Sequence, residues 1–156
     1  MLKKIGMLVL FSTLAAGCAS VPLETAQINK VAKQFDPPSD GKAGLYIYRN
    51  TFYGGAAHTD VMVDGHCIGS SAPYVFFYEE VEGDKSHKVS TKFPWEESPD
   101  PDNDLLIKVK SGMNYFFQQN LNFASTDLEL VDEEEGKKEV SKLDMATKYT
   151  CKRTAP

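Results

Sequence analysis

The residues that could carry nucleophilic or metal chemistry are few and widely spaced in this sequence. His66 and Cys67 are adjacent, which places a base beside a thiol nucleophile. Adjacent side chains of a strand point to opposite faces, so His66 is not expected to activate Cys67. His58, His66 and His87 lack the HExxH or paired-cysteine spacing of zinc sites, so neither a metal nor another cofactor is predicted.

Residues 100–104 read Asp-Pro-Asp-Asn-Asp, which resembles the start of a calcium-binding loop. Such a loop needs glycine at its sixth position and glutamate at its twelfth, where this chain has Leu105 and Ser111. An acidic surface loop is the preferred interpretation, and weak cation binding is the alternative. Residues 69–73 lack the G-x-S-x-G pattern of serine hydrolases, and residues 54–58 lack the lysine of a phosphate-binding loop. The protein is therefore predicted not to be an enzyme.

The N-terminal residues indicate export. Lys3 and Lys4 precede a mostly apolar run at 5–16, which is short for a membrane span and typical of a secretory signal. Residues 15–18 read Ala-Ala-Gly-Cys, which resembles the lipobox of bacterial lipoproteins. Ala15 stands where leucine is usual. The resemblance implies cleavage before Cys18 and acylation of its thiol.

A lipid on Cys18 would hold the protein on a membrane, because each buried methylene contributes ~0.8 kcal/mol and several palmitate-like chains make dissociation negligible. Ala19 is not the aspartate that retains Gram-negative lipoproteins in the inner membrane, so the resemblance implies the outer membrane, facing the periplasm. A soluble protein cut near Ala19 is the alternative. The predicted divisions are a signal peptide at 1–17, an anchor, helix and linker at 18–42, and a folded domain at 43–156.

Assigning Cys18 to the lipid leaves Cys67 and Cys151 as an even pair in an oxidising compartment, which predicts a disulfide. Closing a loop of about 85 residues would stabilise the fold by up to ~4 to 5 kcal/mol in the chain-entropy model. The bond would join the C-terminal tail to the body of the domain.

The composition fits one globular domain with an acidic surface. The 156 residues are 42% apolar and 25% charged, which is typical of a globular chain with a hydrophobic core. Seventeen Lys and Arg against 22 Asp and Glu give a net charge of −5. A nucleic acid partner is therefore not predicted, since a duplex needs a positive surface.

Two helices are predicted. At 22–35 apolar residues recur at i, i+3, i+4 and i+7, with Ser20 as a cap and two prolines after the last turn. We expect this amphipathic helix to pack on the domain, with a membrane-lying helix as the alternative. Near the C-terminus, Asp132 and Glu135 form a capping box that starts a second, short helix.

Short β-branched and aromatic runs predict seven or eight strands. They lie at 45–48, 59–63, 67–68, 74–78, 87–92, 105–110, 113–121 and 128–131. Hairpins are expected at Asp64-Gly65 and Ser111-Gly112. Many short strands with frequent turns indicate a mainly β fold, an antiparallel β-sandwich.

Aromatic residues are concentrated in runs such as 75–78 and 115–117. Consecutive rings on a strand must lie on both faces of its sheet. Most are expected to build the core and cross-strand pairs, and the others to lie on the outer face under a helix or a partner protein.

Three segments carry a family resemblance. Residues 45–49, 61–69 and 112–117 read Leu-Tyr-Ile-Tyr-Arg, Val-Met-Val-Asp-Gly-His-Cys-Ile-Gly and Gly-Met-Asn-Tyr-Phe-Phe. In this order behind a lipobox they resemble an uncharacterised bacterial lipoprotein family classed as a domain of unknown function, over about residues 40–130. The resemblance implies a compact sandwich-like domain in the cell envelope and assigns no catalytic residue.

We therefore expect a non-catalytic envelope lipoprotein whose domain is a periplasmic binding or assembly module for an envelope protein partner. The alternative is a carrier of a small apolar or aromatic ligand in a cleft between the sheet and a helix. An envelope enzyme that uses His66 or His87 is the third hypothesis.

Overall fold

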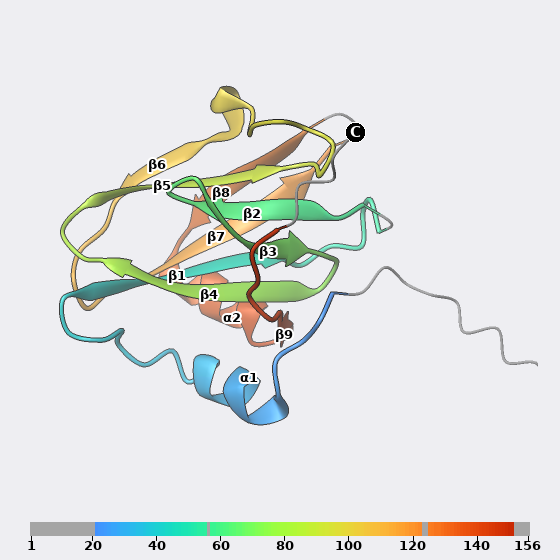
Figure 1. Cartoon of the computed structure of the whole chain (residues 1–156). Coiled ribbons are helices and arrows are strands. Elements are labelled where there is room, and N and C mark those ends of the chain that lie inside the picture. Colours follow the sequence, from blue (N-terminus) through green and yellow to red (C-terminus); the bar gives the residue numbers. More distant parts are fainter. Residues whose placement is uncertain (1–20, 56, 123–124, 152–156) are drawn as a thin grey trace, which may run out of the picture.

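The computed structural model describes residues 21–55, 57–122 and 125–151, so the predicted signal peptide and Cys18 lie outside the described residues. In chain order the elements are α1 (Ala26–Ala32), β1 (Lys42–Arg49), β2 (Thr59–Val63), β3 (His66–Ser71), β4 (Val75–Glu82), β5 (Ser86–Lys92), the 3-10 turn η1 (Pro101–Asn103), β6 (Leu105–Lys108), β7 (Asn114–Leu121), β8 (Thr126–Val131), α2 (Glu133–Val140) and β9 (Asp144–Met145). Two sheets pack face to face, one ordered β8-β7-β1-β4-β9 and the other β3-β2-β5-β6 (Figure 1). The prediction of a mainly β sandwich is confirmed.

β1 is the central strand of the five-stranded sheet, and every residue of it after Lys42 is buried. β4 pairs with β1 in antiparallel orientation along its full length. β7 pairs with the other side of β1 in parallel, and β9 pairs with β4 in parallel. The sandwich therefore contains two parallel pairings that a purely antiparallel arrangement does not have.

The first predicted hairpin is confirmed, because β2 and β3 pair in antiparallel orientation across Asp64-Gly65. Both turn residues have positive φ, 50° for Asp64 and 78° for Gly65. A two-residue turn of this kind matches the twist of the strands that it joins, and aspartate followed by glycine tolerates it well.

The second predicted hairpin, at Ser111-Gly112, is wrong. β6 pairs with β5 in the smaller sheet, whereas β7 pairs with β1 and β8 in the larger one. Between them the buried Val109 donates its backbone N–H to the carbonyl of Lys85, and Gly112 donates to that of Lys42. The turn therefore carries the chain from one sheet to the other, and β7 arrives parallel to β1.

The C-terminal helix forms as predicted. The carboxylate of Asp132 accepts a hydrogen bond from the backbone N–H of Glu135 at 2.9 Å and so caps α2. Glu133 and Lys137 form an i, i+4 ion pair at 2.5 Å. Gly136 and Val140 are buried against the sheet, and a Cβ at Gly136 would fall well inside van der Waals distance of the Phe116 ring.

The N-terminal helix is shorter than the predicted span of 22–35. Its N-cap is Thr25, whose hydroxyl accepts from the backbone N–H of Ile28 at 3.3 Å, while Ser20 lies outside the described residues. The preceding residues are extended because they pair with the C-terminal segment: Leu23 bridges Ala146, and Glu24 donates to the carbonyl of Met145 at 2.8 Å. Neither helix in the described ranges has the length and hydropathy needed to cross a bilayer.

Cys67 and Cys151 are joined by a disulfide, with their Cα atoms 5.6 Å apart. The backbone N–H of Tyr149 donates to the carbonyl of Ile68 at 2.9 Å, so the tail lies beside β3. The C-terminal segment is thereby fixed at both ends, by β9 on the larger sheet and by the disulfide on the smaller one.

Candidate functional site

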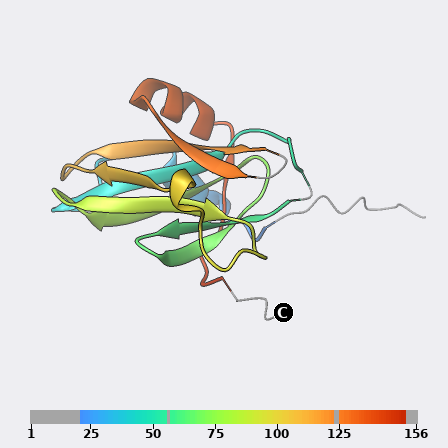
Figure 2. The same ribbon diagram turned by 90° about the horizontal axis from the view of Figure 1, so that it is seen from above.

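The two faces of the five-stranded sheet carry different side chains. The inner face contributes residues such as Leu45, Ile47 and Phe117 to the core between the sheets. The outer face carries a second cluster made largely of rings, and α2 lies over part of it (Figure 2). Its buried members are Tyr46, Tyr48, Phe76, Phe116, Val140, Leu143 and Met145. The expectation of rings on both faces of the sheet is confirmed.

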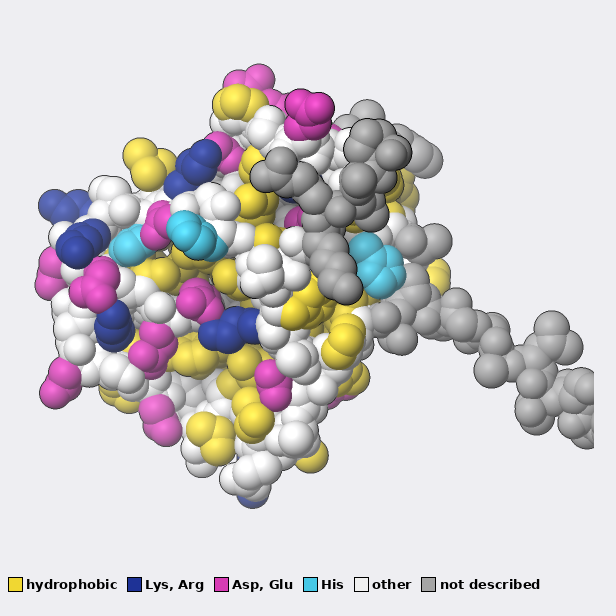
Figure 3. Space-filling model, viewed as in Figure 1, with side chains coloured by type: hydrophobic (Ala, Val, Ile, Leu, Met, Phe, Trp, Pro, Cys, Tyr) yellow, Lys and Arg dark blue, Asp and Glu magenta, His cyan; other side chains and the backbone are white. Residues whose placement is uncertain are grey.

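α1 lies over the remaining part of the outer face and does not close it. No residue of α1 is buried, and Ile28 and Val31 are 45% and 51% exposed. A cleft of about 360 Å³ lies between α1 and the sheet. Its lining comes from α1, the segment after it, and strands β1, β4 and β9: Gln27, Ile28, Val31, Ala32, Asp36, Pro37, Tyr46, Tyr78, Glu80 and Met145. In Figure 3, hydrophobic and acidic side chains are both visible at the lower edge of the molecule, where α1 lies.

Two tyrosine rings from neighbouring strands lie in the cleft. Tyr46 and Tyr78 have ring centroids 4.7 Å apart. The hydroxyl of Tyr46 donates to the carbonyl of Ala32 at 2.9 Å, which ties the end of α1 to the sheet. Burial raises the pKa of both phenols, and the carboxylate of Glu80 raises them further. Both tyrosines are therefore neutral at physiological pH and act as apolar surface with one polar tip.

Acidic groups form the polar part of the lining. Glu80 accepts hydrogen bonds from the hydroxyl of Tyr78 at 3.0 Å and from the backbone N–H of Ser39 at 3.1 Å. Burial by itself would raise the pKa of Glu80, but these bonds and the charge of Lys42 together hold it below its ordinary value. Asp36 is the second carboxylate, and the lining contains neither lysine nor arginine. The cleft thus combines an apolar surface with a fixed negative charge.

This arrangement can bind a molecule but offers little for a reaction. A ligand with an apolar body would contact Ile28, Val31 and the tyrosine rings, and a positively charged or hydrogen-donating end would meet Glu80. The phenols are protonated, and Glu80 is already engaged by two donors.

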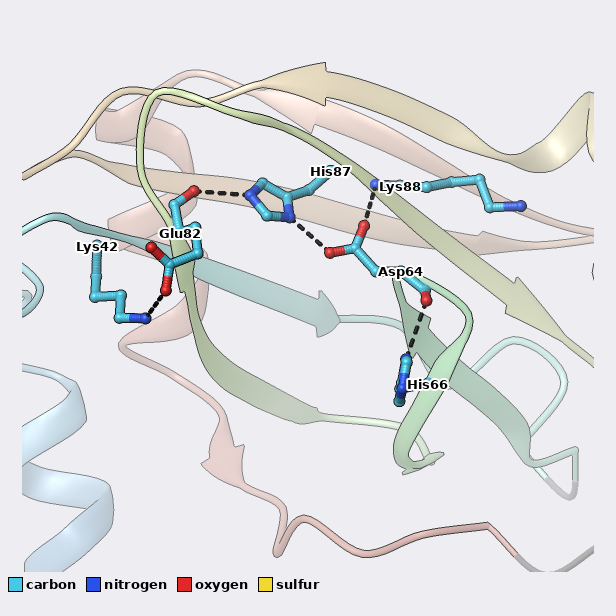
Figure 4. Close-up of polar contacts among 6 residues, drawn as sticks. All are labelled: Lys42, Asp64, His66, Glu82, His87 and Lys88. Carbon is cyan, nitrogen blue, oxygen red and sulfur yellow. Dashed lines mark hydrogen bonds and ion pairs between the residues drawn. The ribbon is translucent and has the colours of Figure 1, made fainter.

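The two histidines weighed as catalytic candidates both contact Asp64, in the turn between β2 and β3 (Figure 4). His87 is buried, with Nδ1 2.6 Å from a carboxylate oxygen of Asp64 and Nε2 2.7 Å from the carbonyl oxygen of Glu82. His66 is exposed, and its Nδ1 lies 3.0 Å from the carbonyl oxygen of Asp64. Since both nitrogens of His87 are occupied, the network serves to hold the turn rather than to move a proton.

The carboxylate of Asp64 completes that network. Its other oxygen accepts from the backbone N–H of Lys88 at 2.9 Å. Desolvation would raise the pKa of Asp64, but the hydrogen bonds from His87 and Lys88 outweigh it and lower the pKa. Asp64 therefore clamps the β2–β3 turn onto β5.

Cys67 and Cys151 also lie close to the carboxylate of Asp60, and the three ligand atoms are within 4.8 Å of one another. Both sulfurs are joined in the disulfide and so are not thiolate ligands. Asp60 instead accepts from the hydroxyl of Ser70 at 2.7 Å and lies 3.7 Å from the ammonium of Lys92.

The acidic stretch at 100–104 forms a surface turn. Asp100 accepts from the backbone N–H of Asp102, and Asp104 pairs with Lys88 at 2.7 Å. These contacts are those of an ordinary loop rather than of converging ligands.

The sequence indicates a cleft between sheet and helix only as part of the alternative hypothesis, and it does not identify the residues that line it. Tyr78 and Glu80 are two residues apart on β4. The alternation of side chains along a strand therefore predicts that they share its outer face. Asp36 comes from the segment after α1, and only the fold brings it into the same cleft as Glu80. The predicted lipidation residue, Cys18, lies outside the described residues.

The chain is similar to known proteins over most of its length. The profile of the family described as "Protein of unknown function (DUF2846)" matches residues 39–131. An "Uncharacterized protein" of Haemophilus influenzae is 44% identical over 140 residues, which cover 87% of this chain and 80% of that protein. The family match spans β1 to β8 and includes the tyrosines and the glutamate of the cleft. The chain therefore belongs to the DUF2846 family.

Proposed function

We propose that the protein is a non-catalytic binding module of the bacterial cell envelope, held on the outer membrane by a lipid on Cys18 and facing the periplasm. The observation that carries the binding role is the cleft between α1 and the five-stranded sheet. The anchor is supported by the lipobox-like residues 15–18 behind a signal-like run.

The dimensions of the cleft favour a small amphiphilic ligand. Its volume of about 360 Å³ lies at the lower end of ligand pockets, which span roughly 300 to 1,000 Å³. Half-exposed Ile28 and Val31 gain burial when an apolar chain fills it. Glu80 and Asp36 favour a cationic end over an anionic one.

A pair of probes with the same chain and opposite charge tests this proposal. Decylammonium and decanoate, both below their micelle concentrations, are titrated into the folded domain by calorimetry and by NMR. Decylammonium should bind more tightly and shift amide signals in α1 and β4. Glu80→Gln should weaken decylammonium by about tenfold or more, because the ammonium loses its charged acceptor, and should strengthen decanoate, because the carboxylate that repels it is removed.

Glu129 offers a matched control, since it is an exposed glutamate on β8, away from the cleft. Glu129→Gln should leave both affinities unchanged. Equal binding of the two probes, or signal shifts spread away from α1 and β4, would contradict a cleft that selects cationic amphiphiles.

Assembly on an envelope protein is a second candidate function, favoured by the apolar side chains that α1 leaves at the surface. A partner helix or loop that covered Ile28 and Val31 would bury them as well as a small ligand does. Crosslinking in intact cells, with a Cys18→Ser form and an Ile28→Ser/Val31→Ser form, distinguishes assembly on a partner protein from binding of a small ligand. A specific partner that is lost in the α1 variant supports assembly, and retention of a small molecule in native mass spectra supports the ligand.

A further inference from the structure

Three loops and the start of the described chain lie at the same end of the sandwich, on the right in Figure 1. Strand pairing establishes this arrangement. The end of β1 pairs with the start of β4, so the loops that follow Arg49 and precede Val75 are neighbours. The start of β2 pairs with the end of β5, so the loop after Lys92 lies at the same end of the sandwich as the loop that joins β1 to β2.

These loops present large aromatic side chains to solvent. Trp95, after β5, is 72% exposed, and Phe52, after β1, is 59% exposed. Tyr53, from the loop after β1, and Tyr74, from the loop before β4, are about half exposed. We call these four residues the aromatic end. Exposed aromatic residues gathered at one end of a domain are uncommon on a surface that only meets water.

Specific contacts hold the loops that carry the aromatic end. Arg49 is fully buried, and its guanidinium donates to the carbonyls of Tyr53 at 2.7 Å, Gly54 at 3.0 Å and Ala57 at 2.8 Å. Trp95 stacks on the buried ring of Phe93, with centroids 4.5 Å apart. The fold therefore holds these aromatic side chains outward at little further cost in conformational entropy.

The described chain also begins at this end. Val21 is buried in the core between the sheets. The carbonyl of Pro22 accepts from the backbone N–H of Thr147 at 2.8 Å, just after the point where Met145 pairs with the start of β4. Cys18 precedes Val21 by three residues, which reach at most about 11 Å even when fully extended.

We infer that the aromatic end lies directly on the membrane, with Trp95, Phe52 and Tyr74 in the headgroup region of the bilayer. This inference rests on the proposed lipid at Cys18. With so short a connection the lipid cannot be far from Val21, so the aromatic end is the part of the domain that meets the surface. Tryptophan and tyrosine favour that interface because each ring has an apolar body and a polar edge.

The charges around the aromatic end indicate the type of lipid. The loop that bears Trp95 continues through Glu96, Glu97 and Asp100. Carboxylates are repelled by anionic headgroups, so neutral, zwitterionic headgroups suit this surface. The domain is thus oriented with its far end, which contains the β2–β3 turn and Asp64, directed away from the bilayer.

Trp95 is the only tryptophan of the chain, so its fluorescence reports on the aromatic end directly. The mature protein is purified from the envelope, its N-terminal mass is measured, and it is reconstituted into phosphatidylcholine vesicles with acyl chains brominated close to the headgroup. We expect a blue-shifted Trp95 emission and the loss of most of its intensity to bromine quenching. Replacing part of the lipid with phosphatidylglycerol should reduce that loss.

Two relocated reporters complete the test. In a Trp95→Phe background, Phe52→Trp should be quenched, whereas Met113→Trp should not, because Met113 is exposed at the opposite end, beside the start of β1. A lipidated protein whose Trp95 is not quenched, or in which both ends are quenched equally, would overturn the membrane contact and leave the anchor standing. A mature N-terminus without a lipid mass would overturn the anchor and the contact together.

Discussion

Two short helices cover the outer face of the same sheet in different ways. α2 buries Gly136 and Val140 against rings of the outer cluster, and Leu143 follows it into that cluster. α1 buries no residue and is attached by hydrogen bonds: Asn29 donates to the carboxylate of Asp144 and accepts from the backbone N–H of Met145. α2 is thus part of the core, whereas α1 is held over the cleft by hydrogen bonds of Asn29 in its middle and of Ala32 at its end.

An amphipathic pattern does not by itself decide whether a helix packs. Ile28 and Val31 have the spacing of a buried face, and yet they line a cleft. α2 has the weaker apolar pattern but has glycine where it meets Phe116, so it approaches the sheet closely. The exposed apolar side chains of α1 therefore suit binding, and those of α2 suit stability.

Removing the disulfide should have the largest effect on stability and should distinguish the roles of α1 and α2 most clearly. Cys67→Ser with Cys151→Ser is expected to lower the free energy of unfolding by about 2 to 5 kcal/mol. The freed tail also leads into β9, which holds α1 through Asn29. Hydrogen exchange should then show α1 losing protection before α2, and equal losses would contradict the separate roles.

Enlarging Gly136 is the next largest change. Gly136→Val is expected to cost about 1 to 3 kcal/mol in urea unfolding, because the new side chain would overlap the fully buried Phe116. Lys30→Val on the exposed surface of α1 is the matched control and should change stability by no more than about 0.5 kcal/mol. A tolerated valine at position 136 would show that α2 is not closely packed.

The two N-caps allow a smaller, symmetrical comparison. Asp132→Ala removes the bond to the N–H of Glu135 and should lower stability by about 1 kcal/mol. Thr25→Ala removes the corresponding bond in α1 but should cost less, since unfolding α1 exposes no buried helix residue. Thermal unfolding of the two variants side by side tests whether Asp132→Ala lowers stability more than Thr25→Ala.

A polar residue at Val31 should change binding more than stability. Val31→Ser is expected to shift the free energy of unfolding by no more than about 0.5 kcal/mol. It should weaken decylammonium roughly threefold to tenfold, since about 1 kcal/mol of apolar contact is lost. Leu106→Ser, at an exposed position on β6, is the control and should leave binding unchanged.

The smallest expected effect is the pH dependence of the cleft. The pKa of Glu80 is lowered in the folded protein, so its contribution to stability is present above the ordinary carboxyl value of 4.5 and is lost as the pH falls through the lowered value. Decylammonium binding should weaken over the same acid range. Glu80→Gln should flatten both profiles there, and an unchanged acid limb would show that another carboxylate is responsible.

Local signals in the sequence predict much of the fold. Asp64-Gly65 and the capping pair Asp132 and Glu135 act within a few residues, so their outcomes follow from turn and helix chemistry alone. The start of α1 is not local, because residues before Thr25 pair with the C-terminal segment more than a hundred positions away.

The cleft is harder to predict for the same reason. The alternation of Tyr78 and Glu80 shows that they share a face, but not what lies opposite. Asp36 and Val31 reach them only through the placement of α1, which depends on β9. Likewise, the glycine turn at Gly112 marks a reversal, but whether the chain stays in its sheet depends on partners elsewhere.

The pairing of Leu23 with Ala146 determines when the fold can close, which bears on the proposed export of the chain. The first described residues and nearly the last belong to one closed unit, and β1 finds β7 only after some seventy residues have intervened. A chain of such high contact order cannot complete its larger sheet while its C-terminus is still being made. For a chain exported as proposed, that sheet would close only after the last strand had emerged.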